Sequence, residues 1–209
     1  MATNEKLSIF QIDVLQEISN IGAGNAATAL SKLLNKRVNM KVPRAGIMPF
    51  NKIFNLVGSE EDVVSCVNFN IKGDIDSCIL FLLTEESSFS LIDLMLGKRV
   101  GATKELDDFG KSVLQEIGNI LCGSFLTALS EVTKLTFTPS VPAFAFDMLG
   151  AVLSGAFLES GYFEDQALII ETQFFQEEIK INGHFFLVPE PECLNVIFRS
   201  LGLDLDGGM

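Results

Sequence analysis

The chain carries the same short polar constellation twice, at matching positions in its two halves. Each copy has an acid or hydroxyl, a Glu four positions later, an Asn three positions after that, and a Pro a further 23 positions on. The members are Asp13, Glu17, Asn20 and Pro43 in the first half, and Ser112, Glu116, Asn119 and Pro142 in the second. The surrounding segments repeat as well: VLQEISNIGAGNAATALS in one half reads VLQEIGNILCGSFLTALS in the other. An internal repeat of this kind constrains the architecture before any other signal.

Hydrophobic periodicity predicts two long amphipathic helices, over residues 8–35 and 107–133. A strand that stops at Pro43 follows the first helix, and a strand that ends at Pro142 follows the second. In each half, two further strands and a short helix complete the order. We expect an α/β (α+β sandwich) fold with a largely antiparallel sheet and two long packed helices that carry the sites. Residues 1–209 would then form one domain with internal pseudo-two-fold symmetry, built from repeats at about 8–100 and 107–205.

Composition excludes several classes of protein. Of the 209 residues, 48% are hydrophobic and 20% charged, which is typical of a globular chain. The net charge of −12 argues against nucleic acid or an anionic membrane as a partner, because both require a basic surface. No segment approaches the ~18 uninterrupted apolar residues of a membrane span, and the N-terminus has no signal-peptide core. These features predict a cytoplasmic protein without membrane insertion.

The usual catalytic and metal-binding patterns are missing. The four cysteines are scattered and predict reduced core thiols, and the single histidine, His184, stands in an apolar context that predicts a structural role. No closely spaced Cys and His ligands suggest a metal site, and no nucleophile elbow suggests a serine triad. The segment GAGNAA follows no strand, so a dinucleotide site is not indicated. Gly24 and Gly123 are expected to permit close packing of the two long helices.

Helical geometry places the polar members of each copy on one face. Positions i, i+4 and i+7 of a helix lie together, so Asp13, Glu17 and Asn20 would point away from the apolar stripe. A single Glu and Asn on such a face are usually just solvated. The repeat favours a function, because most other polar positions differ between the halves whereas Glu and Asn do not. Asn also forms helices poorly, so propensity does not explain its retention.

The chemistry open to a Glu and an Asn without a metal or a nucleophile is narrow. An amide both donates and accepts hydrogen bonds, so it can orient a water molecule, as a glutamine does in small GTPases. A carboxylate next to a phosphoryl group needs a cation, which a lysine of a partner protein would supply. This combination indicates a protein that inserts an amide into another protein's active site.

The pattern [D/S]-x3-E-x2-N-x22-P, present twice, resembles the CheC family of chemotaxis phosphatases, which also includes CheX and FliY. The resemblance covers essentially the whole chain. It is strongest to CheC-type members, because CheX-type chains usually carry one site and FliY-type chains add a flagellar-switch domain. It implies hydrolysis of the aspartyl phosphate of the response regulator CheY. By position, Asn20 and Asn119 would orient the attacking water, and Glu17 and Glu116 would pair with the regulator's lysine. The site-shaping residues would be Asp13, Pro43, Ser112 and Pro142.

The same resemblance implies further partners. CheC proteins bind the receptor deamidase CheD, and the helix after Pro142, beginning at Asp147 and Met148, is the expected contact. No cofactor of the chain's own is expected, and Mg²⁺ would be bound by the response regulator. Two alternatives stay open: a non-catalytic binding regulator of CheD, and a flagellar-switch component in the manner of FliY. We also expect the two sites to lie on separate outward faces of two parallel long helices, each engaging its own regulator.

Overall fold

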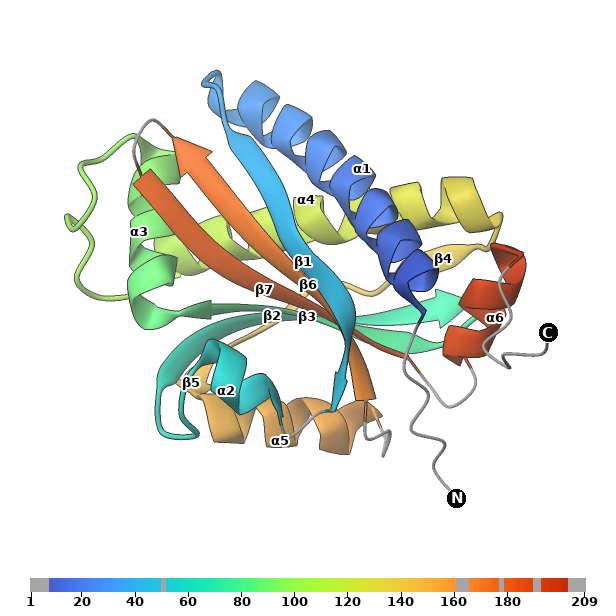
Figure 1. Cartoon of the computed structure of the whole chain (residues 1–209). Coiled ribbons are helices and arrows are strands. Elements are labelled where there is room, and N and C mark those ends of the chain that lie inside the picture. Colours follow the sequence, from blue (N-terminus) through green and yellow to red (C-terminus); the bar gives the residue numbers. More distant parts are fainter. Residues whose placement is uncertain (1–7, 50–51, 161–165, 177–178, 190–192, 203–209) are drawn as a thin grey trace.

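The computed structural model describes residues 8–49, 52–160, 166–176, 179–189 and 193–202, and Figure 1 shows the arrangement of its elements. The helices are α1 (Ile9–Leu34), α2 (Ile53–Val57), α3 (Glu85–Leu96), α4 (Asp108–Thr133), α5 (Leu149–Ser160) and α6 (Cys193–Ser200). The strands are β1 (Asn39–Pro49), β2 (Val63–Gly73), β3 (Ser77–Thr84), β4 (Phe137–Pro139), β5 (Ala143–Met148), β6 (Gln166–Gln176) and β7 (Ile179–Pro189).

The strands of the described ranges form one seven-stranded antiparallel sheet. Its order is β1-β6-β7-β3-β2, and beyond β2 lie both β4 and β5. The shorter β4 pairs with the end of β2 near Ile71, whereas β5 pairs with the start of β2 near Val64. The predicted α+β class with a largely antiparallel sheet is therefore confirmed.

The elements of the second half follow the same order as those of the first. Each half has a long helix, an outer strand segment, a helix, a hairpin and a closing helix. In the first half these are α1, β1, α2, β2–β3 and α3. In the second half they are α4, β4 with β5, α5, β6–β7 and α6. The halves also exchange their outer strands. The first-half β1 pairs with β6, and the second-half β5 pairs with β2, while the hairpins meet where β3 pairs with β7. That this order arose by duplication stays an interpretation of the sequence.

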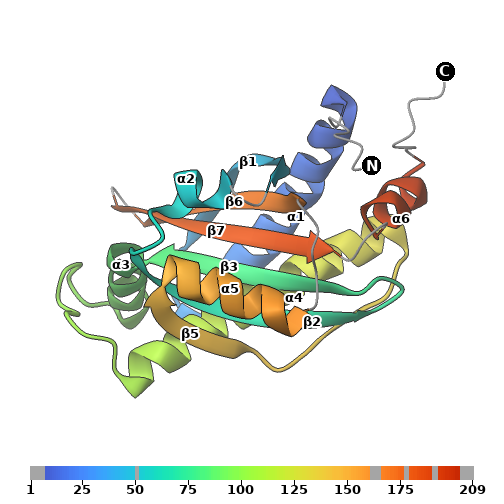
Figure 2. The same cartoon turned by 90° about the horizontal axis from the view of Figure 1, so that it is seen from below.

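Helices cover both faces of the sheet, so the central strands are buried on both sides (Figures 1 and 2). The long helices α1 and α4 lie on one face, over a core that includes Ile79 and Phe81 of β3. The shorter α2 and α5 lie on the other, over a second core that includes Leu80 and Leu82. Alternate residues of β3 thus enter different cores, which explains why SCILFLLT is apolar throughout rather than alternating.

The two long helices pack antiparallel, so the expectation of parallel helices was wrong. Leu33 and Leu34 at the end of α1 line the same groove as Phe109 and Val113 at the start of α4. The helices cross closely at Gly22, where an added Cβ would lie 3.1 Å from the Cα of Phe125.

The expectation that Gly24 and Gly123 permit close packing of the two long helices was wrong. Gly24 and Gly123 are exposed, and a Cβ at either would meet nothing within 4 Å. The glycines that permit close packing are Gly22 against α4 and Gly118 against Val67 of β2. Sequence spacing could not separate these positions, because all four glycines stand within helical segments of similar composition.

Local side-chain chemistry fixes where the helices begin. Ser8 and Gln11 form a reciprocal capping box at the start of α1, and Asp107 accepts from the backbone N–H of Gly110 at the matching start of α4. At α3 the cap is the Thr84 side chain, which accepts from the backbone N–H of Ser87. Ser88, in contrast, is buried and hydrogen-bonded to Ser65.

Two predicted boundaries next to the prolines were wrong. The strand after α1 does not stop at Pro43 but continues to Pro49, with a register shift between Lys41 and Arg44 that accommodates the proline. In the second half, Pro142 lies between β4 and β5. The helix expected to begin at Asp147 and Met148 begins at Leu149 instead, because Asp147 and Met148 are the last residues of β5 and pair with β2.

Length and composition alone would allow α4 to cross a membrane. Half of the apolar stretch of α4 is, however, buried inside the fold, against the sheet and α1. A core helix of a globular domain can be as long and as apolar as a membrane-spanning helix. We therefore assign α4 to the core.

A buried carboxylate holds the link between the halves. Asp93 at the end of α3 accepts hydrogen bonds from the backbone N–H groups of Ala102 (2.9 Å) and Thr103 (3.0 Å) and from the Thr103 hydroxyl (2.7 Å). Burial opposes ionisation of Asp93, but these hydrogen bonds outweigh it and lower its pKa from 3.8. The polar link is therefore fastened to α3 by an ionised group.

We expect Gly118→Ala to destabilise the fold. An added Cβ would lie 2.8 Å from Cγ1 of Val67, inside the core, so overpacking of about 1–3 kcal/mol should exceed the gain in helix propensity. Thermal unfolding would show a lower Tm than wild type. Gly155→Ala is the control, because its Cβ meets nothing within 4 Å and should leave Tm unchanged or raised. Equal behaviour of the two variants would contradict the packing argument.

Asp93→Asn should destabilise the protein in a pH-dependent way. An amide presents one acceptor oxygen where the carboxylate presents two, so we expect a loss of about 1–3 kcal/mol near neutral pH. Because the pKa of Asp93 is lowered by folding, its ionised form stabilises the native state above the unfolded-state pKa. That contribution is lost as the pH falls through the folded-state pKa. The Tm difference between wild type and variant should therefore be largest near pH 7 and narrow below about pH 4. A constant difference would argue against an ionised Asp93.

Candidate functional site

The structure places both copies of the repeated constellation on the outer surface of the long helices. Glu17 and Asn20 of α1 are exposed, and so are Glu116 and Asn119 of α4. Their neighbours on the opposite side are core residues, such as Ile18, which is 2% exposed. Asp13 and Ser112, one turn earlier on each helix, are exposed too. Each helix therefore buries one face and presents a carboxylate and an amide on the other.

The prolines lie beside these helices, and a glutamine in each copy connects the two. The side-chain amide of Gln16 donates to the carbonyl of Val42 (3.4 Å), directly before Pro43. The amide of Gln115 donates to the carbonyl of Pro142 (3.5 Å). Both bonds are long, and their acceptors differ by one position between the copies, but in each copy the glutamine before the Glu connects the helix to the proline segment.

Sequence reasoning did not single out these glutamines. The signal was present, because the repeated text VLQEI contains the glutamine in both halves next to the glutamate. Gln16 and Gln115 thus link each long helix to its proline segment next to the exposed carboxylate.

The carboxylate of each site stands outside any ion pair in the part of the chain that the structure describes. The ion pairs in the described ranges join Arg44 to Glu171 and Lys72 to Asp76, and neither includes Glu17 or Glu116. No group of three His, Cys, Asp or Glu side chains in the same ranges could hold a metal ion. An exposed carboxylate and amide in this setting can accept and donate hydrogen bonds and can orient a water molecule. A reaction at either site still needs electrophilic groups from a partner.

The other candidate groups lie away from these helices. His184 of β7 stacks on Phe186 in the core beneath α2 and α5, and burial lowers its pKa to about 4. Burial likewise raises the pKa of the Cys122 thiol to about 12 and that of Cys66 still further. Cys66 and Cys122 are buried thiols, and the repeated sites have neither a histidine base nor a thiolate nucleophile among the described residues.

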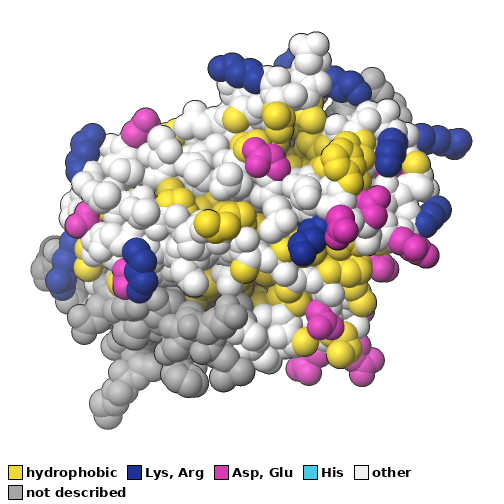
Figure 3. All heavy atoms as spheres, turned by 180° about the vertical axis from the view of Figure 1, so that it is seen from behind, with side chains coloured by type: hydrophobic (Ala, Val, Ile, Leu, Met, Phe, Trp, Pro, Cys, Tyr) yellow, Lys and Arg dark blue, Asp and Glu magenta, His cyan; other side chains and the backbone are white. Residues whose placement is uncertain are grey.

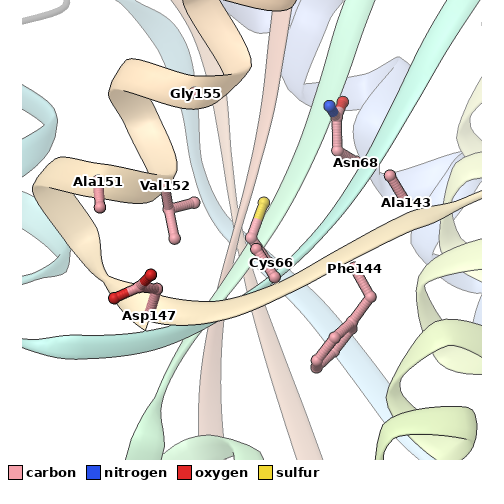
Figure 4. Close-up of a pocket in the computed structure, with 9 residues that line it drawn as sticks. Cys66, Asn68, Ala143, Phe144, Asp147, Ala151, Val152 and Gly155 are labelled. Carbon is pink, nitrogen blue, oxygen red and sulfur yellow. The ribbon is translucent and has the colours of Figure 1, made fainter.

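Asp147 and Met148, the expected deamidase contact, lie at the junction of β5 and α5. Both are exposed, and Met148 is 48% exposed. Asp147 also lines a cavity of about 230 Å³ between β2, β5 and α5, where it lies close to Ala151 and Val152 of α5 (Figure 4). This surface lies on the side of the sheet opposite α1, so it is separate from both repeated sites.

Comparison with known proteins relates the chain to one family. The family model described as CheC-like matches residues 10–47 and 109–145, which contain both constellations. The chain is 34% identical over 201 residues to the CheY-P phosphatase CheC of Bacillus subtilis (strain 168), covering 93% of this chain and 95% of that protein. It is 36% identical over 139 residues to the flagellar motor switch phosphatase FliY of the same organism, covering 65% of this chain and 36% of FliY.

Among solved structures, Thermotoga maritima FliY has the same fold. Its TM-score is 0.76 at 20% identity, covering 94% of this chain and 98% of that one. The fold is thus the α+β fold that this FliY structure also has. The extent and level of identity to CheC go further, and the chain belongs to the CheC-like family.

Proposed function

We propose that the chain is a phosphatase of a phosphorylated CheY-type response regulator. The observation that carries this proposal is the exposure of one Glu–Asn pair on each long helix, at matching positions, with neither Glu in an ion pair of the described residues. The likeness to a CheY-P phosphatase over almost the whole chain supports the same reaction class.

In the proposed reaction, each site completes the active site of the regulator. The side-chain amide of Asn20 or Asn119 orients a water molecule, whose oxygen attacks the phosphorus of the aspartyl phosphate. The bond from phosphorus to the aspartate oxygen breaks, which releases inorganic phosphate and restores the carboxylate. Mg²⁺ bound by the regulator would neutralise the charge that develops on the phosphoryl oxygens.

Glu17 and Glu116 would position the regulator rather than react. A carboxylate next to the phosphoryl group is tolerated only when paired, and the regulator's active-site lysine would supply the cation. Asp13, Ser112, Pro43 and Pro142 would shape the two sites, with the prolines held by Gln16 and Gln115. Positioning of this kind lowers the entropic cost of the reaction.

We further propose that Asp147 and Met148 contribute to binding of the receptor deamidase CheD. Their exposure at the β5–α5 junction leaves them accessible while a regulator occupies α1 or α4. We also assign the protein to the cytoplasm, where its proposed partners act. A role as a flagellar-switch component is the rival function that the similarity to FliY favours. Binding of the regulator or of a motor protein without release of phosphate would support this rival.

The double variant Asn20→Ala/Asn119→Ala should lose regulator dephosphorylation and keep its fold. Loss of a group that orients the attacking water costs on the order of 10²-fold in rate per site. Phosphate release from acetyl-phosphate-labelled regulator measures the effect, and Tm checks the fold. Asn25→Ala is the control, since Asn25 is an exposed asparagine of α1 outside the constellation. Near-wild-type activity of the double variant would refute the catalytic assignment.

Single-site variants should each retain part of the activity. The two sites are on different helices and each would engage its own regulator, so the fractions left in Asn20→Ala and in Asn119→Ala should add up to roughly the wild-type rate. Steady-state kinetics at low regulator concentration would measure these fractions. Complete loss in either single variant would instead indicate one composite site.

Glu17→Gln/Glu116→Gln should reduce the salt dependence of regulator binding. The substitution keeps the shape of each side chain and removes its charge, so the variant should bind more weakly at low salt and change less as salt rises. Stability should stay within about 0.5 kcal/mol of wild type, because both residues are exposed. KM and kcat at two ionic strengths, with Glu86→Gln of α3 as control, would test this. Salt slopes identical to wild type would show that these carboxylates do not carry the charge pairing.

A further inference from the structure

Each site has exposed apolar residues beside it, at positions that match between the halves. Phe10 at the start of α1 is 63% exposed and Phe109 at the start of α4 is 62% exposed. Leu33 near the end of α1 is 59% exposed and Val132 near the end of α4 is 41% exposed. Single exposed apolar residues need no explanation, but the same exposure at equivalent positions of both halves does.

The phenylalanines stand on the same helix face as the polar constellations. Phe109 precedes Ser112 by three positions and Glu116 by seven, which is one face of a helix, and Phe10 has the same relation to Asp13 and Glu17. At the second site the antiparallel packing brings Leu33 next to this face.

Together these residues form a groove of about 210 Å³, lined by Leu33 and Phe109 as well as by Ser112 and Glu116. Its apolar floor is therefore continuous with the polar site. Figure 3 shows hydrophobic side chains gathered among acidic and basic ones on the face seen from behind Figure 1.

A second repeated feature lies at the other end of each constellation. Gly24 follows Asn20 by four positions and Gly123 follows Asn119 by four, so both extend the same face. Both stand in regular helix, where Thr28 and Thr127 donate to their carbonyl oxygens (2.9 and 2.8 Å). Glycine weakens a helix interior, and no neighbour within 4 Å requires it at either position. The fold itself gives no reason to keep either glycine.

We propose that each constellation is the middle of a longer docking surface for the phosphorylated regulator. Phe10 or Phe109 binds an apolar patch of the regulator at one end, and Gly24 or Gly123 lets the regulator's main chain approach the helix at the other. The span from the phenylalanine to the glycine is about 21 Å at 1.5 Å per residue, which suits a protein surface better than a small molecule. This inference rests on the proposed function, since it names the partner of the same sites.

The regulator fits this surface better than other occupants do. The exposed phenylalanine and the exposed glycine both adjoin the constellation directly, and both occur in each of its two copies. The net charge of −12 disfavours an anionic membrane. A second copy of the chain is the remaining occupant, and the experiments below include it as an outcome.

Substitution of the two glycines gives the first test, because the proposal predicts that it stabilises the fold and weakens binding of the regulator. Gly24→Ala/Gly123→Ala should raise Tm by about 2–4 °C per site, through better helix propensity. The same variant should raise the Kd for the regulator about fivefold or more, and Leu at both positions should raise it further. Gly155→Ala in α5, where a Cβ also meets open space, should raise Tm without changing the Kd. A wild-type Kd for the Leu variant would overturn the close-approach assignment.

Phenylalanine substitution gives the second test. Phe10→Ser/Phe109→Ser should raise KM and the Kd about tenfold, with kcat nearly unchanged, because an apolar contact away from the reacting atoms contributes equally before and during the reaction. The loss should not depend on salt. Val196→Ser is the control, since Val196 is an exposed residue of α6 (39%) outside both constellations. If the Phe variant changes the oligomeric state in sedimentation and not the Kd, the occupant is a second copy and the proposal is overturned.

Direct binding separates this inference from the proposed function. The probe is the regulator with beryllium trifluoride on its aspartate, a stable mimic of the phosphoryl group. Binding that depends on the phenylalanines and glycines, without phosphate release by the wild type, would uphold the docking surface and refute the phosphatase. Phosphate release with unchanged KM in both variants would uphold the phosphatase and refute the docking surface.

Discussion

The close packing of α1 against α4, on one face of the sheet, determines which side of each helix faces outward and therefore where the two sites lie. Gly22 allows the helices to approach within contact of the Phe125 backbone, and Gly118 seats α4 directly on Val67. Because each helix is held on its inner side by the core, its outer side has one orientation only. The helix positions that carry the exposed Glu and Asn residues are therefore fixed by a rigid scaffold, although no hydrogen bond within the described residues holds their side chains.

Much of this arrangement could be predicted from the sequence, since it depends on periodicity. The long helices, both hairpins and the outward face of the constellations follow from apolar spacing over segments of adequate length. The relative direction of the helices could not be predicted, because parallel and antiparallel packing use the same apolar stripe. Leu33 shows the limit: it continues the helical spacing of Leu15, Ile18 and Ala26 and is therefore expected in the buried stripe, yet it is exposed at the last turn, where Leu30 is buried instead.

The boundaries next to the prolines were hidden for a different reason. A proline ends a strand in most contexts, but a register shift lets β1 continue past Pro43 while it pairs with a strand far away in the sequence. Likewise, FDMLGAVLSG has helical composition throughout, and only pairing with β2 holds Asp147 and Met148 in a strand. Tertiary pairing decided both cases against local preference. The contacts of Gln16 and Gln115 were missed because a polar residue next to the core reveals its partner only in three dimensions.

The exchange of outer strands has a consequence for how such a chain can change over time. Because β1 completes the sheet of the second half and β5 completes that of the first, neither half presents a finished sheet edge without the other. A gene encoding only one half would leave its hairpin without a neighbour on either side. A superfluous site can therefore be lost by substitution of its surface residues but not by deletion of the segment that carries it. In descendants of such a chain, a silent half would persist as scaffold, recognisable by its intact core and its altered surface.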